Sequence, residues 1–165
     1  MLSCDFWLRQ KAYTYFVIAV AIFIIDQATK TWVKKSIHPF ENIHVAPFFN
    51  LVYVENTGSA FGMFKSLGNT FFVSISIFAI IVISILIIKD KTNRLPYALL
   101  LGGALGNMTD RLIYGYVIDF LDFHIGGYHW YAFNIADASL SVGMLLMLIN
   151  VLLPQKTAKN EAKTT

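Results

Sequence analysis

Long apolar segments dominate this sequence and constrain its fold more than any other feature. The cleanest one runs from about Thr70 to Ile88 and consists almost wholly of Ile, Val, Phe, Ser and Ala. A helix of about 20 such residues spans a bilayer, and it bonds every backbone polar group within itself, as hydrocarbon requires. With 56% hydrophobic and only 14% charged residues, the chain is predicted to fold in a membrane and not as a soluble domain.

Four such segments are predicted to cross the membrane, at about residues 13–33, 70–88, 95–114 and 134–153. The third starts next to Pro96, which the first turn of a helix tolerates, and its small residues allow close helix contact. Pro154 is expected to end the fourth. Since four spans take about half of the chain, we predict that residues 1–165 form a single integral membrane domain.

Basic residues predict the orientation of these spans. Lys and Arg cluster at one set of span ends, within residues 9–11, 89–94 and 156–163. The positive-inside rule therefore places both termini in the cytoplasm, although Lys34, Lys35 and Lys65 fall on the outer side. The net charge of +3 forms no dense basic stripe, so we expect no nucleic-acid partner. The single cysteine, Cys4, excludes a disulfide within one chain.

The two outer connections, about residues 34–69 and 115–133, are where we expect the chemistry. In the first, the aromatic and β-branched run FFNLVYV (residues 48–54) indicates a short strand, and ENTGSAFG (residues 55–62) supplies turn residues. The predicted fold class is therefore an all-α membrane protein, with four transmembrane helices and a small extracytoplasmic β-rich cradle.

Ionisable residues gather in or beside the spans. Each costs about 2.5 to 3.5 kcal/mol on insertion scales, so each needs a partner or a purpose. In the predicted topology they all fall in the outer half of the membrane or just above it, which indicates one polar site there. The residues concerned are Asp26, Lys30, Asp110, Arg111, Asp119, Asp122 and Asp137.

Some of these residues are spaced as supporting sets. Asn107, Asp110 and Arg111 share a helix face at i, i+3 and i+4, and Asp26 and Lys30 are likewise four residues apart. We expect Arg111 to pair with a carboxylate through a bidentate fork, as a buried ion pair that holds helices together and not as a catalytic group.

Asp119 and Asp137 differ from these sets because neither has a basic residue three or four positions away. They bracket the connection between the third and fourth spans, so the chain can bring them together. Two carboxylates in a poorly solvated site share one proton, so that one is charged and the other neutral. Such a pair activates water for attack on a peptide carbonyl, as in aspartic proteases.

Other interpretations stay open. Asp137 also suits the N-terminal turn of a helix, and Asp119 suits a turn before an apolar run. Asp122, His124 and His129 form a candidate metal site, although they lack the HExxH spacing. No GxSxG string supports a serine mechanism. A small ion or proton transporter would use intramembrane charges as a relay, and an accessory subunit would use them as structural ion pairs.

Four strings in this order resemble the lipoprotein signal peptidases, also called signal peptidase II: DQATK (26–30), ENTGSAFG (55–62), GGALGNMTDRLIYGYVIDFLDF (102–123) and FNIADASL (133–140). The similarity covers nearly the whole chain. One string alone would be weak, but four in matching order and in matching positions relative to the spans are highly specific. The string HIGGYHWYA (124–132) matches no motif that we can assign.

The resemblance implies a membrane-embedded aspartic peptidase of the bacterial inner membrane, with its site toward the extracytoplasmic side. Such enzymes remove the signal peptide of diacylglyceryl-modified prolipoproteins just before the lipidated cysteine, need no metal or other cofactor, and are the target of globomycin. The expected partners are this substrate and membrane lipids, and we expect a monomer. The family pattern makes Asp119 and Asp137 catalytic. Residues expected to bind substrate or brace the site are Asp26, Lys30, Asn56, Gly58, Asn107, Asp110, Arg111, Asn134 and Ala136.

Overall fold

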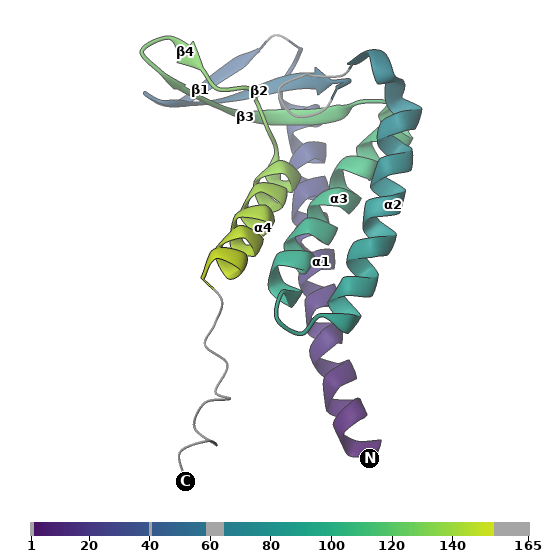
Figure 1. Ribbon diagram of the computed structural model, residues 1–165. Coiled ribbons are helices and arrows are strands. Elements are labelled where there is room, and N and C mark those ends of the chain that lie inside the picture. The colour runs from purple at the N-terminus through teal and green to yellow at the C-terminus, as the bar shows by residue number, and fades with distance from the viewer. Residues whose placement is uncertain (1, 40, 59–64, 154–165) are drawn as a thin grey trace.

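A small antiparallel sheet lies across one end of a helical bundle (Figure 1). The computed structural model describes residues 2–39, 41–58 and 65–153, with side chains from residue 12 onward. The elements follow the order α1 (Leu2–Ser36), β1 (Asn42–Ala46), β2 (Phe49–Asn56), a short 3-10 helix (Lys65–Leu67), α2 (Gly68–Lys89), α3 (Arg94–Tyr114), β3 (Val117–Ile125), β4 (Tyr128–His129) and α4 (Ile135–Leu152).

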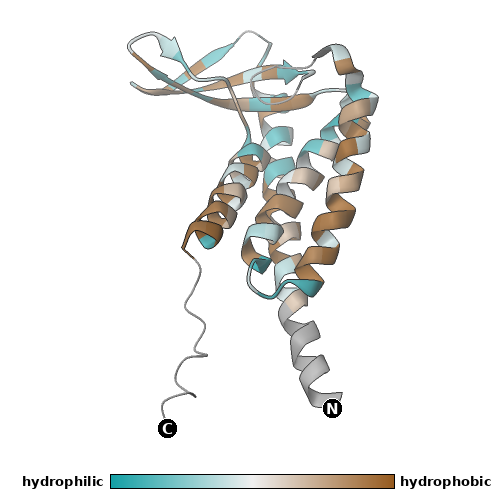
Figure 2. Cartoon of the chain, in the orientation of Figure 1, coloured by the Kyte–Doolittle hydropathy of each residue, from teal (hydrophilic) through white to brown (hydrophobic). Residues whose placement is uncertain are grey.

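Three helical segments in the described part of the chain are long and apolar enough to cross a membrane: Ala12–Ser36 of α1, α2 and α4. In α2 only Phe72 and Ile87 are buried, so most of its apolar surface faces outward, as a bilayer favours. Figure 2 shows the resulting pattern, in which α2 is hydrophobic along most of its length and the ends of α1 and α4 next to the sheet are hydrophilic. The chain is therefore a membrane protein.

The helix α3 is less apolar because other helices surround it. It contacts α1, α2 and α4, and it contains a large share of the buried helical residues. Glycines allow this close approach: a Cβ on Gly102 would lie 2.8 Å from the Ala19 carbonyl oxygen of α1, and one on Gly103 would lie 2.5 Å from the Ala136 carbonyl oxygen of α4. The polar residues of α3 are thereby enclosed by protein.

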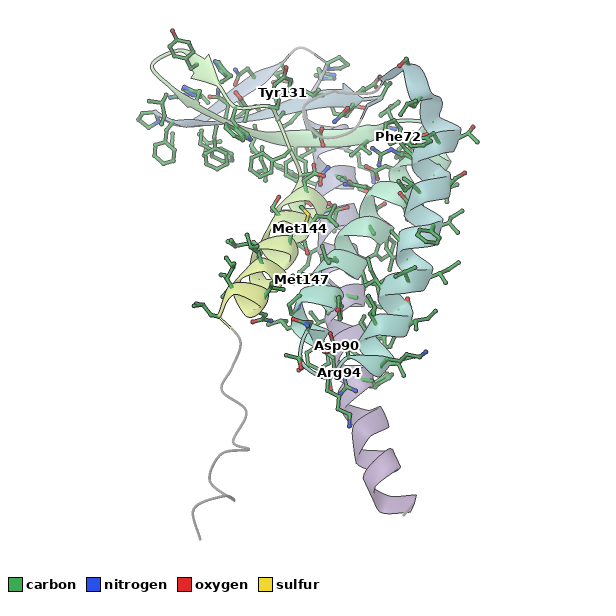
Figure 3. The ribbon with its side chains drawn as sticks, in the orientation of Figure 1. Phe72, Asp90, Arg94, Tyr131, Met144 and Met147 are labelled. Carbon is green, nitrogen blue, oxygen red and sulfur yellow. The ribbon has the colours of Figure 1, made fainter. Side chains whose placement is uncertain are left out.

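Polar contacts close the end of the bundle away from the sheet, where Asp90 and Arg94 lie (Figure 3). Arg94 is buried and donates from Nε to the Ile87 carbonyl oxygen at 3.0 Å, which satisfies a carbonyl in the last turn of α2. Asp90 accepts from Asn93 Nδ2 at 2.8 Å and from the Tyr97 hydroxyl at 3.0 Å. These bonds fix the turn between α2 and α3.

The four strands follow the order β1-β2-β3-β4, and all neighbours are antiparallel. Val54 of β2 lies opposite Asp119 of β3. The end of α1 packs against the sheet through a buried cluster of Val33, Ile37, Ile118 and Phe120. The sheet is thus attached to the bundle beside the strand that carries Asp119.

The strand expected at residues 48–54 is present as β2, but the β-rich region is larger than expected. Val117–Ile125 forms a nine-residue strand in a connection for which no secondary structure was predicted. Its core-facing and cavity-facing residues are both buried near its start, so the usual alternation of apolar and polar residues is weak there. Residues 59–62 of the expected turn and Pro154 lie outside the described residues.

Candidate active site

Where the sheet meets the bundle there is a cavity of about 580 Å³. One part of its wall is polar and comes from β2, α3, β3 and α4, with Asn56, Asn107, Arg111, Asp119 and Asp137. Another part is apolar and follows α4, with Leu140, Val142 and Met144 among its residues. Tyr131 lies at the level of the sheet and Met144 lies further along α4 (Figure 3). The cavity therefore joins a carboxylate pair to an apolar surface.

Asp119 is held on β3 by two side-chain amides. Its side chain accepts from Asn134 Nδ2 at 2.7 Å and from Asn56 Nδ2 at 3.0 Å, and the residue is only 2% exposed. Burial raises the pKa of the Asp119 carboxyl from 3.8 to about 7, and the neighbouring Asp137 acts in the same direction. Near neutral pH this carboxyl is therefore able to hold a proton.

Asp137 lies in the first turn of α4, where it forms a capping box with Asn134. The Asp137 backbone N–H donates to Asn134 Oδ1 at 2.9 Å, and the Asn134 backbone N–H donates to Asp137 Oδ2 at 3.3 Å. The other oxygen of Asp137 accepts from Asn107 Nδ2 at 2.8 Å. The helix-terminal interpretation of Asp137 is thus confirmed, and it does not compete with a place in the cavity.

Two asparagines connect the carboxylates to each other. Asn134 bonds to both Asp119 and Asp137, and its Nδ2 lies 3.2 Å from Asn107 Oδ1. Asn134 is fully buried, and each of its polar groups has a partner in this network. Since rotation of either carboxylate would break such bonds, both side chains are held in defined positions.

Below the pair lies a buried ion cluster centred on Lys30. Its ammonium group is 2.8 Å from Asp26 and 3.0 Å from Asp110, and it donates to Asn107 Oδ1 at 3.0 Å. The expected pairing of Asp26 with Lys30 is confirmed. The expected pairing of Arg111 with a carboxylate is wrong: among the described residues, the Lys–Asp ion pairs are made by Lys30, and Arg111 donates to the carbonyl oxygens of Gly58 (2.9 Å) and Asn107 (3.4 Å).

The same cluster positions the two elements that carry the pair. Asp26 accepts from the backbone N–H of Ala136 at 2.8 Å, in the first turn of α4. Asp110 accepts from the backbone N–H of Ile118 at 3.0 Å, next to Asp119 on β3. Gly58 is held by its own N–H, which donates to Asn56 Oδ1 at 2.9 Å. Of the site residues selected from the sequence, five therefore line the cavity: Asn56, Asn107, Arg111, Asp119 and Asp137. Lys30, Gly58 and Asn134 are hydrogen-bonded to these five residues. Asp26 and Asp110 are connected to them through Lys30, and Ala136 directly precedes Asp137.

Two features of the site were missed in the sequence. Gln27 donates to Asp26, to Asp110 and to the Gly106 carbonyl oxygen at 2.9 to 3.2 Å, and its place inside DQATK was the available signal. The segment of Trp130, Tyr131, Ala132 and Phe133 forms an aromatic wall of the cavity. This segment lines the same cavity as Asp119 because the chain folds back and pairs with β3, which the sequence did not indicate.

The alternative metal site is not supported. Asp122 and His129 form a hydrogen-bonded pair at 2.9 Å, and His124 stacks on His129 with ring centroids 4.9 Å apart. Among the residues whose positions are described, no group of three or more His, Cys, Asp or Glu side chains is arranged to hold a metal ion. The donors present near Asp119 are amides, which suit a carboxylate pair.

The fold is that of a bacterial membrane enzyme. The structure superimposes with a TM-score of 0.80 on a solved bacterial membrane enzyme at 2.3 Å resolution, with 37% identity, 88% of this chain covered and 93% of that one. A second solved bacterial membrane enzyme, at 1.9 Å, gives a TM-score of 0.77, also at 37% identity, over 86% of this chain and 94% of that one.

The family model for signal peptidase (SPase) II matches residues 18–153. The lipoprotein signal peptidase of Thermodesulfovibrio yellowstonii is 47% identical over 138 residues, which cover 84% of this chain and 94% of that protein. That of Alteromonas mediterranea is 39% identical over 154 residues, covering 87% and 82%. The chain belongs to the signal peptidase II family, as its four motifs indicated, and is a membrane peptidase.

Proposed function

We propose that this protein is an aspartic endopeptidase that removes signal peptides from diacylglyceryl-modified bacterial prolipoproteins, cutting before the lipidated cysteine. Asp119 and Asp137 are its catalytic residues. The observation that carries the proposal is that both carboxylates line one cavity and are bonded to a common asparagine, Asn134. The family membership and the names of the relatives support the substrate class.

The reaction uses one shared proton. The charged carboxylate takes a proton from a water molecule as its oxygen attacks the peptide carbonyl, and the protonated carboxyl donates to the carbonyl oxygen. The raised pKa of Asp119 favours it as the protonated partner. The resulting tetrahedral intermediate collapses when the amine leaves with a proton, and the pair returns to its single-proton state. No metal or other cofactor takes part.

The neutral amides around the pair suit this chemistry. Asn56 and Asn134 hold Asp119, and Asn107 holds Asp137, without adding a cation that would keep both carboxyls ionised. Arg111 lines the cavity and lies 5.1 Å from the Phe72 ring centroid. We assign Asn56 and Arg111 to binding of peptide carbonyls, and the remaining site residues to support.

The cavity suits a substrate that arrives by diffusion within the bilayer. Its lining combines Ser76 of α2 with Leu140, Val142 and Met144 of α4, so the apolar part follows the outer surface of the bundle. A signal peptide placed along this surface brings its scissile bond to Asp119 and Asp137. Globomycin-type inhibitors are expected to compete for the same space, with membrane lipids as the surrounding solvent.

The same proposal includes the topology. We place four spans across the bacterial inner membrane in one domain, with α3 as the protein-enclosed third span, both termini cytoplasmic and the sheet outside. Exposed aromatic residues on the sheet, among them Trp130 and Tyr131, suit the headgroup region of the outer leaflet. We expect the protein to act as a monomer.

The direct test is cleavage of a diacylated prolipoprotein by the purified protein in detergent. Wild type should release the signal peptide, whereas Asp119→Asn and Asp137→Asn should each lower kcat by about 10⁴-fold or more, as removal of a central acid or base does. EDTA should have no effect. Cleavage retained by either variant would remove the catalytic assignment, and loss of activity on chelation would favour a metallopeptidase.

A further inference from the structure

A polar network covers the face of the sheet that is turned away from the active-site cavity. Asp122 of β3 accepts from Asn50 Nδ2 of β2 at 2.9 Å and from His129 Nδ1 of β4 at 2.9 Å. Asn50 Oδ1 also lies 3.0 Å from His44 Nδ1 of β1. The network therefore connects all four strands, with the buried Asp122 carboxylate at its centre.

The aromatic wall begins immediately after this network. His129 ends β4 and reaches Asp122, and the two residues that follow the strand, Trp130 and Tyr131, line the cavity. Neither Asp122 nor His129 lines that cavity. Both residues are therefore available to act on the wall without touching the reacting groups.

Backbone hydrogen bonds attach the wall to β3 at both of its ends. The Trp130 backbone N–H donates to the Phe123 carbonyl oxygen at 2.7 Å, and Phe133 exchanges two backbone hydrogen bonds with Leu121 at 2.8 and 3.1 Å. Tyr131 and Ala132 lie between these attachments. The pair of His129 and Asp122 reinforces the first end with a side-chain bond to a carboxylate that is only 8% exposed.

Trp130 lies where a displacement would matter. It lines the active-site cavity and also a second, mainly apolar cavity of about 490 Å³, whose other residues include Phe48, Phe123, Ile125 and Tyr128. A shift of Trp130 would therefore change the shape of both cavities. The apolar α4 side of the cavity suits the signal peptide, which precedes the scissile bond. In a substrate bound this way, the residue after the scissile bond lies against the wall.

We propose that Asp122 and His129 are positioning residues that hold Trp130 and Tyr131 as a wall against the lipid-modified cysteine of the substrate. This inference rests on the proposed function. It assigns the network to substrate affinity and not to bond cleavage, because His129 directly precedes the wall and neither His129 nor Asp122 lines the cavity that holds the carboxylate pair.

The test separates KM from kcat for cleavage of a diacylated prolipoprotein. His129→Leu removes the donor to Asp122 and should raise KM about tenfold, with kcat within about twofold of wild type. His129→Gln keeps an N–H donor and should stay near the wild-type KM. Asp122→Ala removes the acceptor and should raise KM by itself, and combining it with His129→Leu should add little, because both changes break the same bond.

The control is His38→Leu, which removes an exposed histidine that lines neither cavity; it should leave KM and kcat unchanged. Unchanged KM in His129→Leu, a fall in kcat alone, or additive effects of the two changes would overturn the inference. If His129→Leu does not accumulate, Asp122→Ala carries the same test. An inactive wild-type protein, or cleavage by Asp119→Asn, would count instead against the proposed function.

Discussion

Asp119 and Asp137 have surroundings that differ from those of the other buried acids. Asp26 and Asp110 each contact the Lys30 ammonium and also accept a backbone N–H, so their negative charges are compensated. The closest donors to Asp119 and Asp137 are neutral amides and backbone N–H groups. The Lys30 ammonium therefore stabilises the charged forms of Asp26 and Asp110. Within the described part of the chain, Asp119 and Asp137 have no such contact and are able to share a proton.

The raised pKa of Asp119 predicts a pH-dependent stability. Its folded pKa of about 7 exceeds the ordinary 3.8, so its contribution is largest below pH 3.8 and is lost as the pH rises through 7. Asp119→Asn should therefore unfold at a higher temperature than wild type, with an advantage about 4 kcal/mol larger at pH 8 than at pH 4. Thermal unfolding in detergent measures this difference.

Asp90 provides a control with the opposite shift. Its hydrogen bond from the Asn93 side chain lowers the pKa of this carboxyl, which lies in the turn between α2 and α3. Its contribution is present above pH 3.8 and is lost only below it. Asp90→Asn should therefore be destabilised by a similar amount at pH 4 and pH 8. An Asp119→Asn advantage that did not change with pH would contradict the assignment of a shared proton.

At the scale of elements, the site depends on how closely α3 approaches its neighbours. Asp119 is on β3 and Asp137 is on α4. Asn107 of α3 donates to Asp137, and Asp110 of α3 accepts from the backbone N–H of Ile118, the residue before Asp119. Glycines set the distances from α3 to both α1 and α4, since a Cβ on Gly106 would collide with Asp26 of α1 and would also approach Ala136 of α4. The positions of the two carboxylates therefore depend on the close packing of these helices.

Gly103→Ala tests this link. The added Cβ would lie 2.5 Å from the Ala136 carbonyl oxygen, a backbone atom that moves only if α4 moves. We expect a loss of about 1–3 kcal/mol in stability and a lower kcat, since α4 carries Asp137. Unfolding and cleavage assays measure the two effects. Leu112→Ala, on the exposed surface of the same helix, should change neither; a normal kcat in Gly103→Ala would separate packing from catalysis.

At the scale of the whole molecule, the fold separates a lipid-facing bundle from a sheet that covers one end of it. The polar site lies at the junction, where the apolar surface of α4 meets the strand that carries Asp119. A substrate anchored in the bilayer reaches this junction without leaving the membrane. The orientation of the bundle in the membrane therefore decides from which side of the bilayer water reaches the active site.

Cysteine labelling tests that orientation. In a Cys4→Ser background, Tyr128→Cys places a thiol on the sheet, where the native side chain is 88% exposed, and Lys91→Cys places one at the opposite end of the bundle. A membrane-impermeant maleimide should label the first in intact cells with a permeable outer membrane, and the second only after lysis. Labelling of position 91 from outside would reverse the proposed topology.

The sequence by itself determined that the chain folds in a membrane, where its helices lie and to which family it belongs. Hydropathy and span length are properties of local segments, so helices lie near all four predicted ranges, with end positions set by capping and packing. The motifs also selected a set of residues that the folded chain brings together around Asp119 and Asp137. These features needed no knowledge of long-range contacts.

Only the tertiary structure decided which partners the charges take and where the sheet lies. Lys30, and not Arg111, bridges Asp26 and Asp110, because the choice depends on how α1 approaches α3. The long strand β3 and the wall that begins at Trp130 form through pairing between segments that are distant in sequence. Ion pairing and strand pairing are set by packing geometry, which residue spacing along the chain does not contain.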